Sequence, residues 1–230
     1  MFRKGEITTV FMDVDDTILD FYESARESIR GCFLKNGLAY SDDIFRFFIR
    51  RNIKLWQNIE DGILTVDELH RTRWDGIFRD LGIHADGPAF EQDFIAGLRW
   101  TAFPVEGAND LMEYLHGRYK VYMVSNASNI QQITRLGKVG LMQYVDGVFG
   151  SLDIGINKPA PGYFDYCFSQ LPGTRPEQTV IVGDSLNADI CGGAAYGLHT
   201  IWFNIRNIEP SNIVIPDYTV YSLSEIKSIL

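Results

Sequence analysis

The chain has 230 residues, of which 46% are hydrophobic and 22% are charged. This composition is typical of a folded globular protein and excludes the disordered and fibrous classes, and the length allows a full core plus a smaller accessory domain. The formal net charge of -9 argues against binding of nucleic acid or of an anionic membrane surface by bulk electrostatics. An anionic ligand would therefore have to be attracted locally.

The cysteines and the N-terminal region indicate the compartment. Cys32, Cys167 and Cys191 are scattered, and they lack the spacing of a zinc site or of a disulfide framework. No apolar run reaches the length of a membrane-spanning helix, and Glu6 lies where a signal peptide would be apolar. We therefore expect a cytoplasmic protein with buried thiols and no membrane or nucleic-acid partner, whereas an oligomeric partner is not predictable from the sequence.

The first predicted element is a buried strand over residues 7–12, which leads directly into Asp13-Val14-Asp15-Asp16-Thr17. Side chains alternate along a strand, so Asp13 and Asp15 are expected to point the same way. Two carboxylates about 4 Å apart repel by roughly 4 kcal/mol at an effective dielectric constant of about 20. Holding both of them ionised requires a cation or a shared proton, which is a first indication of a metal site.

Residues 20–101 follow a different pattern, with apolar residues at helical spacing and no convincing strand. Amphipathic helices are predicted around residues 21–33, 45–59, 69–78 and 90–98. Thr65 and Glu68 form a plausible capping box at the start of the third helix. We predict an all-helical cap domain that interrupts the sheet. Trp56 and Trp74 could stack on a nucleobase, although their helical spacing favours core packing.

Apolar runs and helical segments alternate through the remainder of the chain. Strands are predicted at residues 121–124, 145–149, 179–182, 200–203 and near 218–220, and helices around 111–115, 130–133 and 163–168. This alternation predicts an α/β fold with a Rossmann-like parallel sheet between helices, over residues 1–19 and 102–230. Parallel strands share one carboxyl edge, and ligands of such open sheets bind in the crevice outside it.

Polar motifs follow the predicted strand ends along this edge. They are Ser125-Asn126, then Lys158 in the loop Asn157-Lys158-Pro159, and finally Gly183-Asp184-Ser185. Together with Asp13-Val14-Asp15, their order resembles the motifs of haloacid-dehalogenase-superfamily phosphatases that carry a helical cap after the first motif. The stretches DVDDTILDF, KPAPGYFDY and GDSLNADI are most similar to the pyrimidine 5'-nucleotidase branch of this superfamily.

The resemblance implies that Asp13 is a nucleophile that attacks phosphorus and forms an aspartyl-phosphate. A carboxylate is a weak nucleophile, so a metal and Lys158 would have to neutralise the phosphoryl oxygens. Taken alone, the segment could also be a solvated acidic turn. A calcium loop fits poorly, because its sixth position would be Ile18 rather than glycine and because a strand precedes it.

For Asp15 the resemblance implies general acid and base catalysis. It would protonate the leaving alcohol and then take a proton from the water that hydrolyses the intermediate, a role typically worth about 10² to 10⁴ in rate. Dehalogenases of the same fold expel a halide without a proton and lack this second aspartate, so Asp15 favours a phosphatase. The alternative is that Asp15 simply caps the following turn.

The resemblance also implies a Mg²⁺ ion as cofactor. Its ligands would be the carboxylates of Asp13 and Asp184 and the backbone carbonyl of Asp15, with water and the substrate phosphate completing the octahedron. Asp189 would support the metal from outside this set of ligands. Asp189 could instead be an ordinary acidic residue in the first turn of a helix that begins near Ser185.

Lys158 would supply the positive charge that an acidic protein needs at a phosphate site, although most lysines are only solvated surface. Ser125, Asn126 and Thr17 are candidate phosphate contacts, and Ser125-Asn126 could equally be a helix N-cap. Asp16 and Ala127 occupy positions where many relatives have glycine. These two departures leave the chemistry intact but put the local loop geometry in question.

We therefore expect a magnesium-dependent phosphomonoester hydrolase of small phosphorylated metabolites, foremost nucleoside 5'-monophosphates. The alternatives are a sugar-phosphate or phosphoglycolate phosphatase, or a phosphomutase built on the same core. A non-enzymatic phosphate-binding protein is disfavoured because Asp13, Asp15, Lys158 and Asp184 are all present. The four histidines show no metal-ligand spacing.

Overall fold

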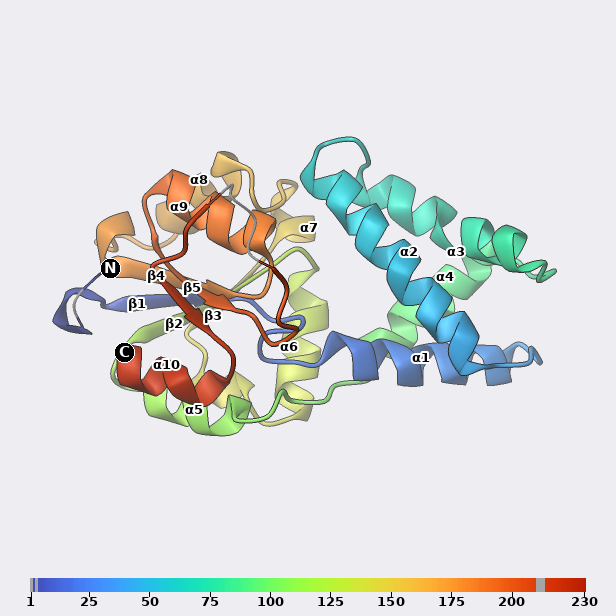
Figure 1. Cartoon of the computed structure of the whole chain (residues 1–230), viewed down its shortest axis with the longest axis horizontal. Helices are drawn as coiled ribbons and strands as arrows, with labels where there is room; N and C mark the ends of the chain where they lie inside the picture. Colours follow the sequence, from blue (N-terminus) through green and yellow to red (C-terminus); the bar gives the residue numbers. More distant parts are fainter. Residues whose placement is uncertain (1, 3, 210–213) are drawn as a thin grey trace. The chain divides into compact units, whose positions relative to one another are not determined.

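The computed structural model describes residues 2, 4–209 and 214–230. The chain separates into two compact units, one formed by Met1–Asp20 with Phe103–Leu230 and the other by Phe21–Ala102 (Figure 1). The sequence analysis placed the corresponding boundaries after residues 19 and 101. The first unit is called the α/β unit below and the second the helical unit.

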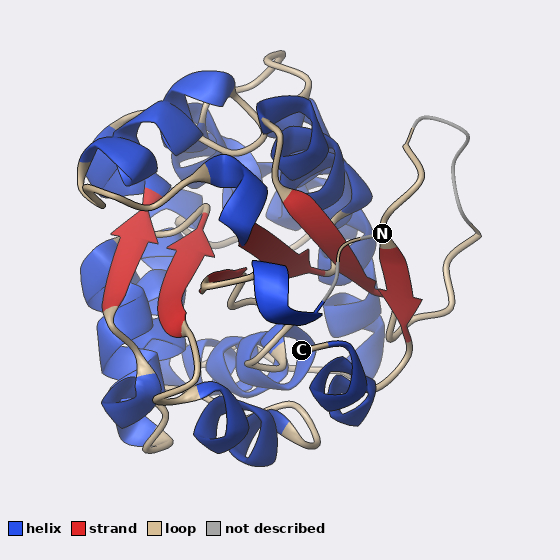
Figure 2. Ribbon diagram, turned by 90° about the vertical axis from the view of Figure 1, so that its left-hand side faces the viewer, coloured by secondary structure: helices blue, strands red, loops and turns tan. Residues whose placement is uncertain are grey.

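Within the described residues, six strands of the α/β unit form one parallel sheet (Figure 2). They are β1 (Thr9–Met12), β2 (Lys120–Ser125), β3 (Gly147–Gly150), β4 (Thr179–Gly183), β5 (His199–Phe203) and β6 (Tyr218–Val220). Their spatial order is β3-β2-β1-β4-β5-β6, and every neighbouring pair is parallel. The predicted parallel α/β fold is confirmed, with β1 and β4 side by side at the centre.

The central strands are buried because helices cover both faces of the sheet, which explains their continuous apolar sequence. All four residues of β1 are buried, and Phe11 pairs in register with Tyr122 on one side and Ile181 on the other. Phe11 and Ile181 pack with Phe164 and Cys167 in one hydrophobic cluster. This packing holds the carboxyl ends of β1 and β4 next to each other.

The α/β unit contains helices α5 (Ala108–Leu115), α6 (Asn129–Lys138), α7 (Ser151–Ile154), α8 (Pro161–Ser169), α9 (Gly192–Tyr196) and α10 (Leu223–Ile229). It also contains short 3₁₀ turns η1 (Lys4–Glu6), η2 (Met142–Tyr144) and η3 (Pro176–Gln178), and a π-helical turn η4 (Leu186–Cys191). Helices α8 and α9 lie on one face of the sheet, and α5 and α10 on the other (Figure 1). Both layers expected of a parallel α/β fold are therefore present.

Helix α6 forms where the spacing of Ile130 and Ile133 predicts a helix, but these two residues are on its exposed side. Their exposed fractions are 54% and 40%. The buried side carries Gln132 and Arg135, both fully buried, together with Leu136. An apolar pattern thus located the helix correctly but indicated the wrong face, because the inward face of α6 is polar.

The helical unit consists of α1 (Phe21–Lys35), α2 (Asp42–Glu60), α3 (Val66–Leu81) and α4 (Gly87–Arg99). The capping box of Thr65 and Glu68 is confirmed at the start of α3. Trp74 is 1% exposed and stacks on Phe48 with ring centroids 5.3 Å apart. Trp74 is therefore a core residue and cannot stack on a nucleobase, and Trp56 packs beside a smaller apolar cluster that includes Ile59.

A buried ion pair lies in the core of the helical unit. Arg73 and Glu91 have side chains 3% and 5% exposed, and the guanidinium donates two hydrogen bonds to the carboxylate, at 2.5 and 3.1 Å. Arg73 also donates to Asn52 Oδ1 at 2.8 Å and lies over the ring of Phe94. Burial raises the pKa of Glu91 while Arg73 opposes the rise. The pair is satisfied only as long as both partners are present.

Glu91→Gln is therefore expected to destabilise the helical unit by about 3 to 5 kcal/mol, because it leaves a buried guanidinium without its counter-charge. Urea denaturation followed by circular dichroism measures this loss. Asp93→Asn is the matched control on the same helix, since Asp93 pairs with Lys35, which is 67% exposed. That exposed pair is expected to contribute at most about 1 kcal/mol. Equal stabilities of the two variants would contradict the expectation.

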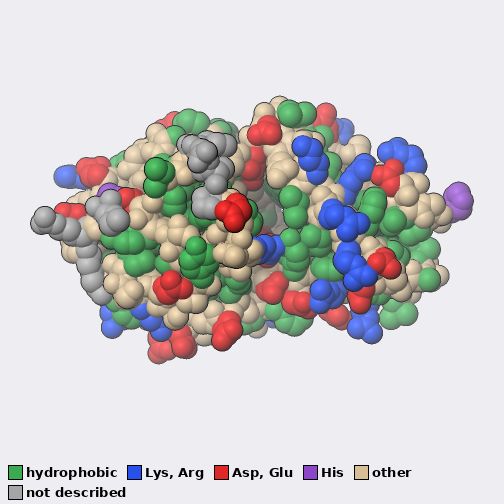
Figure 3. Space-filling view, viewed as in Figure 1, with side chains coloured by type: hydrophobic (Ala, Val, Ile, Leu, Met, Phe, Trp, Pro, Cys, Tyr) green, Lys and Arg blue, Asp and Glu red, His purple; other side chains and the backbone are tan. Residues whose placement is uncertain are grey.

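A hollow of about 370 Å³ lies within the helical unit, lined by Arg51, Leu55, Thr72, Arg73, Asp75, Gly76 and Arg79. On the face drawn in Figure 3, Lys and Arg side chains gather over this unit. In the hollow, however, Arg51 pairs with Asp80 at 2.6 Å and Arg73 pairs with Glu91. The third arginine that lines the hollow, Arg79, is 74% exposed and its Nε lies 3.7 Å from Oδ1 of the same Asp80. None of the described helices combines the length and the apolar character needed to cross a membrane.

Candidate active site

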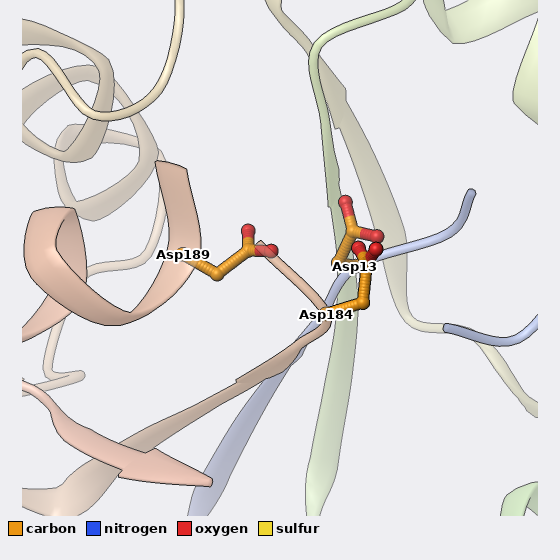
Figure 4. Close-up of side chains that lie close together, drawn as sticks. All are labelled: Asp13, Asp184 and Asp189. Carbon is orange, nitrogen blue, oxygen red and sulfur yellow. The ribbon is translucent and has the colours of Figure 1, made fainter. Parts of the chain in front are cut away.

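Acidic side chains converge at the carboxyl edge of the sheet. Asp13 follows β1 directly, Asp184 follows β4, and Asp189 lies on the η4 turn that continues from β4. Each of the three offers a carboxylate oxygen, and these oxygens lie within 4.8 Å of one another. Figure 4 shows the carboxylates of Asp13 and Asp184 side by side, with Asp189 pointing toward them from its helical turn. The convergence follows from the parallel pairing of β1 and β4.

Asp13 is held by one neighbour on each oxygen. Its Oδ1 accepts a hydrogen bond from Lys158 Nζ at 2.8 Å, and its Oδ2 accepts one from Thr17 Oγ1 at 3.0 Å. The residue is only 7% exposed. Burial raises the pKa of Asp13 from the ordinary 3.8 to about 7, with Lys158 opposing the rise and Asp189 adding to it. The carboxylate is thus fixed in orientation, and its charge depends on the cations around it.

Lys158 is the buried cation of this site. Its Nζ donates to Asp13 Oδ1 and Val124 O, both at 2.8 Å, and to Asp189 Oδ1 at 2.6 Å. Burial works against the charged ammonium, but the two carboxylates outweigh it and raise the pKa of Lys158. The side chain is 2% exposed. This lysine is therefore no solvated surface residue but a fixed positive charge between two acids.

Asp189 approaches the site over a glycine. A Cβ atom at Gly183 would lie 2.2 Å from Asp189 Oδ2, so only glycine permits this contact. Asp189 Oδ2 also accepts a hydrogen bond from Ser185 N at 3.2 Å, and Ser185 caps the turn by accepting from Ala188 N. Because Asp189 is paired with Lys158, it positions the lysine.

Asp15 lies apart from the acidic cluster. Its carboxylate accepts hydrogen bonds from Arg135 Nη1 at 2.5 Å and from Gln132 Nε2 at 2.7 Å, both on α6. Ser125 joins this group, since its Oγ accepts from Gln132 Nε2 at 2.8 Å. The structure therefore places Asp15 and Ser125 with α6, and Asp13, Asp184, Asp189 and Lys158 with one another.

Asn126 contacts the loop that carries the lysine. Its Oδ1 accepts from Lys158 N at 2.8 Å, and its Nδ2 donates to Lys158 O at 3.0 Å. This paired contact fixes the backbone of Lys158. Thr17 is fully buried and donates a hydrogen bond to Asp13 through its hydroxyl. For Asn126, Thr17 and Ser125, contact with a phosphate stays a prediction.

Asp16 has a backbone φ of 64°, the left-handed region that favours glycine and that aspartate tolerates better than most residues. Its carboxylate pairs with Arg206 at 2.7 Å. Burial, and after it the carboxylates of Asp16 and Asp13, raise the pKa of Asp184 well above its ordinary value, while Arg206 opposes the rise. The local turn is thus the one that glycine would form, with an added ion pair beside Asp184.

Sequence reasoning did not find Gln132, Arg135 or Arg206. The available signal for the first two is their spacing, because residues three positions apart on a helix share a face. On α6 that face carries a glutamine and an arginine instead of apolar residues. Arg206 follows β5 without any recognisable pattern.

A divalent cation fits the donors of this site. Hard cations such as Mg²⁺ prefer carboxylate oxygens, and three such oxygens converge here without any competing nitrogen or sulfur ligand in the group. Asp13 and Asp184 are the candidate ligands with a raised pKa, which burial produces and a bound cation would reverse. Asp189 already pairs with Lys158. The donor set therefore fits a divalent cation, whereas the ligand set expected from the sequence, which includes the Asp15 backbone carbonyl, stays a prediction.

The stabilisation by magnesium is expected to grow with pH. Protons on Asp13 compete with the metal below about pH 7, since its pKa is raised to about 7. The native state without metal then binds more protons at Asp13 than the unfolded state does between pH 3.8 and about pH 7, so ionisation of Asp13 destabilises the native state as the pH rises through that window.

Thermal unfolding with and without magnesium tests this expectation. At a magnesium concentration about 100 times Kd, the gain in stability is expected to be about 2.7 kcal/mol. The gain should be present near pH 8, diminish near pH 5, and be lost at both pH values in Asp184→Asn. A gain that does not change with pH would contradict it.

Several known proteins are similar to this chain over most of its length. Residues 7–197 match the family model described as haloacid dehalogenase-like hydrolase. The chain is 36% identical over 224 residues to the HAD-hydrolase YfnB of Bacillus subtilis. This match covers 96% of this chain and 94% of YfnB. It is 30% identical to the pyrimidine 5'-nucleotidase PynA of Streptococcus pneumoniae, covering 94% and 92%. It is 27% identical to the pyrimidine 5'-nucleotidase YjjG of Escherichia coli, covering 96% of each.

A solved structure shares the whole fold. The crystal structure of YfnB from Bacillus subtilis, bound to magnesium, superposes with a TM-score of 0.93 and 34% identity. The match covers 97% of this chain and 98% of that chain. The likeness therefore includes both the α/β unit and the helical unit.

Proposed function

Because the chain belongs to the haloacid dehalogenase-like hydrolases, we propose that it is a magnesium-dependent phosphomonoester hydrolase with Asp13 as nucleophile. The observation that carries the proposal is the contact of Lys158 Nζ with Asp13 Oδ1 at 2.8 Å, beside the oxygens of Asp184 and Asp189. A buried carboxylate oxygen, a fixed cation and further acidic ligands are the groups that phosphoryl transfer to an aspartate requires.

In the first step, a carboxylate oxygen of Asp13 bonds to phosphorus while the bond from phosphorus to the leaving oxygen breaks. Asp15 gives its proton to that leaving oxygen, so an alcohol departs. Lys158 neutralises negative charge beside the nucleophile, as a preorganised charge does at a phosphoryl group. Asp13, Asp184 and the backbone carbonyl of Asp15 would hold Mg²⁺. When bound, this ion would supply further charge neutralisation and orient the phosphate.

In the second step, water attacks the phosphorus of the aspartyl-phosphate. The Asp15 carboxylate takes a proton from this water as its oxygen bonds to phosphorus, and the bond to Asp13 breaks. Inorganic phosphate and the original Asp13 carboxylate result, with the proton again on Asp15. Thr17 contributes by holding Asp13 Oδ2 in place.

For the substrate, we propose a nucleoside 5'-monophosphate. Two relatives that match most of this chain, PynA and YjjG, are named pyrimidine 5'-nucleotidases. We assign the choice of leaving group to the helical unit, Phe21–Ala102, which would act as a cap domain. The magnesium-bound structure of YfnB is described as revealing interdomain movement, which supports a mobile cap.

Hydrolysis of a substrate panel by the purified chain tests the proposal. The panel contains pyrimidine and purine 5'-monophosphates, sugar phosphates, phosphoglycolate and p-nitrophenyl phosphate, each with magnesium and with a chelator. We expect the highest kcat/KM for a pyrimidine 5'-monophosphate and no turnover with the chelator. A preference for a sugar phosphate or for phosphoglycolate would overturn the substrate assignment, and an isomerised hexose phosphate would indicate a phosphomutase. Absence of turnover on every substrate would overturn the hydrolase itself.

Asp15→Asn is expected to slow hydrolysis most for poor leaving groups, because these need protonation as they depart. In the first turnover, release of the leaving group is expected to slow by about 10² to 10⁴ with a nucleoside 5'-monophosphate and much less with p-nitrophenyl phosphate, whose phenolate leaves without a proton. The measurement is the rate of the first turnover by rapid quench on both substrates, because the later hydrolysis of the intermediate uses Asp15 in either case. An equal loss on both would argue against leaving-group protonation by Asp15.

A further inference from the structure

Two side chains of α6 donate hydrogen bonds to the Asp15 carboxylate, one to each oxygen. Arg135 Nη1 donates to Oδ1 at 2.5 Å, and Gln132 Nε2 donates to Oδ2 at 2.7 Å. Residues three positions apart on a helix lie on one face, so a single turn of α6 presents both donors. Asp15 itself keeps 29% of its side chain exposed. The contacts from α6 therefore fix the Asp15 carboxylate, and part of its side chain remains accessible.

The two donors also fix each other. Gln132 Oε1 accepts from Arg135 Nη1 at 3.1 Å, and Gln132 Nε2 donates to Ser125 Oγ at 2.8 Å. These contacts define the orientation of the Gln132 amide, because a flipped amide would place its oxygen against the carboxylate. The amide can therefore present only its N–H group to Asp15.

This polar face is unfavourable for stability alone. Gln132 and Arg135 are fully buried while Ile130 and Ile133 of the same helix are 54% and 40% exposed. Burying a guanidinium is costly, and packed apolar residues of similar volume often stabilise a protein as well or better. A helix that breaks the hydrophobic pattern in this way, next to a functional carboxylate, points to a functional requirement.

The hydrogen bonds from α6 also keep the Asp15 carboxylate separate from the acidic cluster. Asp13, Asp184 and Asp189 bring their oxygens within 4.8 Å of one another around Lys158, and Asp15 is outside this group. Asp15 is only two residues from Asp13, so a free side chain could turn toward a bound cation and become a ligand. The contacts from α6 hold it where it can exchange a proton instead.

We propose that Arg135 and Gln132 are positioning residues for Asp15, which hold its carboxylate ready for proton transfer to the leaving oxygen and from water. The inference rests on the proposed function. Arg135 has the larger effect because its contact is charged, whereas Gln132 contributes a neutral hydrogen bond. Neither residue reaches the substrate in this assignment, and both act through Asp15.

Kinetics of Arg135→Met on two substrates tests the proposal. With uridine 5'-monophosphate, release of uridine in the first turnover, measured by rapid quench, is expected to slow about 10- to 100-fold, a part of the effect of general acid catalysis. With p-nitrophenyl phosphate, release of p-nitrophenolate in the first turnover should change by less than about 3-fold, since this leaving group needs no proton. Arg135→Lys should recover part of the loss on the nucleotide. Lys138→Met is the matched control, because Lys138 is exposed on the same helix, and it should behave like the wild type on both substrates.

A double-mutant cycle with Asp15→Asn separates positioning from a structural role. If Arg135 acts through Asp15, adding Arg135→Met to Asp15→Asn should cause no further loss on the nucleotide. Equal losses on the two substrates, or additive losses in the double variant, would overturn the proposal. Should Arg135→Met fail to fold, Gln132→Leu carries the same comparison. A different result would overturn the proposed function, namely wild-type protein that hydrolyses neither substrate in the presence of magnesium.

Discussion

Asp13→Asn is expected to lower kcat by about 10⁴-fold or more on every substrate, because the amide cannot form a bond to phosphorus and leave again. The variant should remain folded. Burial raises the pKa of Asp13, so the site disfavours its charge, and Lys158 keeps its contact with Asp189 Oδ1 at 2.6 Å when Asp13 loses its charge. Stability of the metal-free variant should therefore equal or exceed that of the wild type.

Acid quenching during turnover, followed by borohydride reduction and peptide mass spectrometry, detects the intermediate. Wild-type protein should yield a reduced residue at position 13, and Asp13→Asn should yield none. Asp110→Asn is the control, since Asp110 is an exposed carboxylate in the first turn of α5, and its turnover should be unchanged. Normal activity in Asp13→Asn would exclude this residue as the nucleophile.

Lys158→Met is expected to impair both turnover and stability. Its ammonium donates to Asp13, Asp189 and Val124 O within 2.8 Å, and its removal leaves two buried carboxylates facing each other. Losing one partner of a buried charged group costs about 3 to 5 kcal/mol. Loss of a preorganised charge at the reacting group lowers kcat by about 10² to 10³.

The pH dependence identifies the cause of this instability. Without Lys158, the carboxyls of Asp13 and Asp189 repel each other only when ionised, so denaturant unfolding should show a larger loss near pH 8 than near pH 5. Lys158→Arg retains the charge and should recover part of the stability. Wild-type turnover and stability in Lys158→Met would contradict the role assigned to this cation.

The fold could be predicted from the sequence because strands and helices of a parallel α/β unit carry distinct patterns. The buried run at residues 7–12 is followed directly by Asp13, and the run at 179–182 is followed by Gly183 and Asp184. Parallel pairing of β1 and β4 brings Asp13 and Asp184 together. Lys158 lies in a loop that comes after β3, and parallel strands share one carboxyl edge, so the lysine is expected at this same edge. Backbone topology therefore brings the acidic residues and their cation to one edge of the sheet.

The residues that support the site could not be predicted in the same way. Gln132 and Arg135 lie on a helix face that hydrophobic spacing assigns to solvent, since Ile130 and Ile133 mark the other face. Asn126 holds both backbone groups of Lys158, a contact that joins residues 32 positions apart. Such hydrogen bonds depend on side-chain packing, which leaves no periodic signal in the sequence.

A crystal structure of the chain with Mg²⁺ and beryllium trifluoride tests the central claim most directly, because this anion mimics a phosphoryl group on a carboxylate. The account predicts beryllium bonded to a carboxylate oxygen of Asp13, Lys158 beside it, and magnesium bound by Asp13 and Asp184. Beryllium trifluoride on another residue, or magnesium that does not touch both aspartates, would contradict the account.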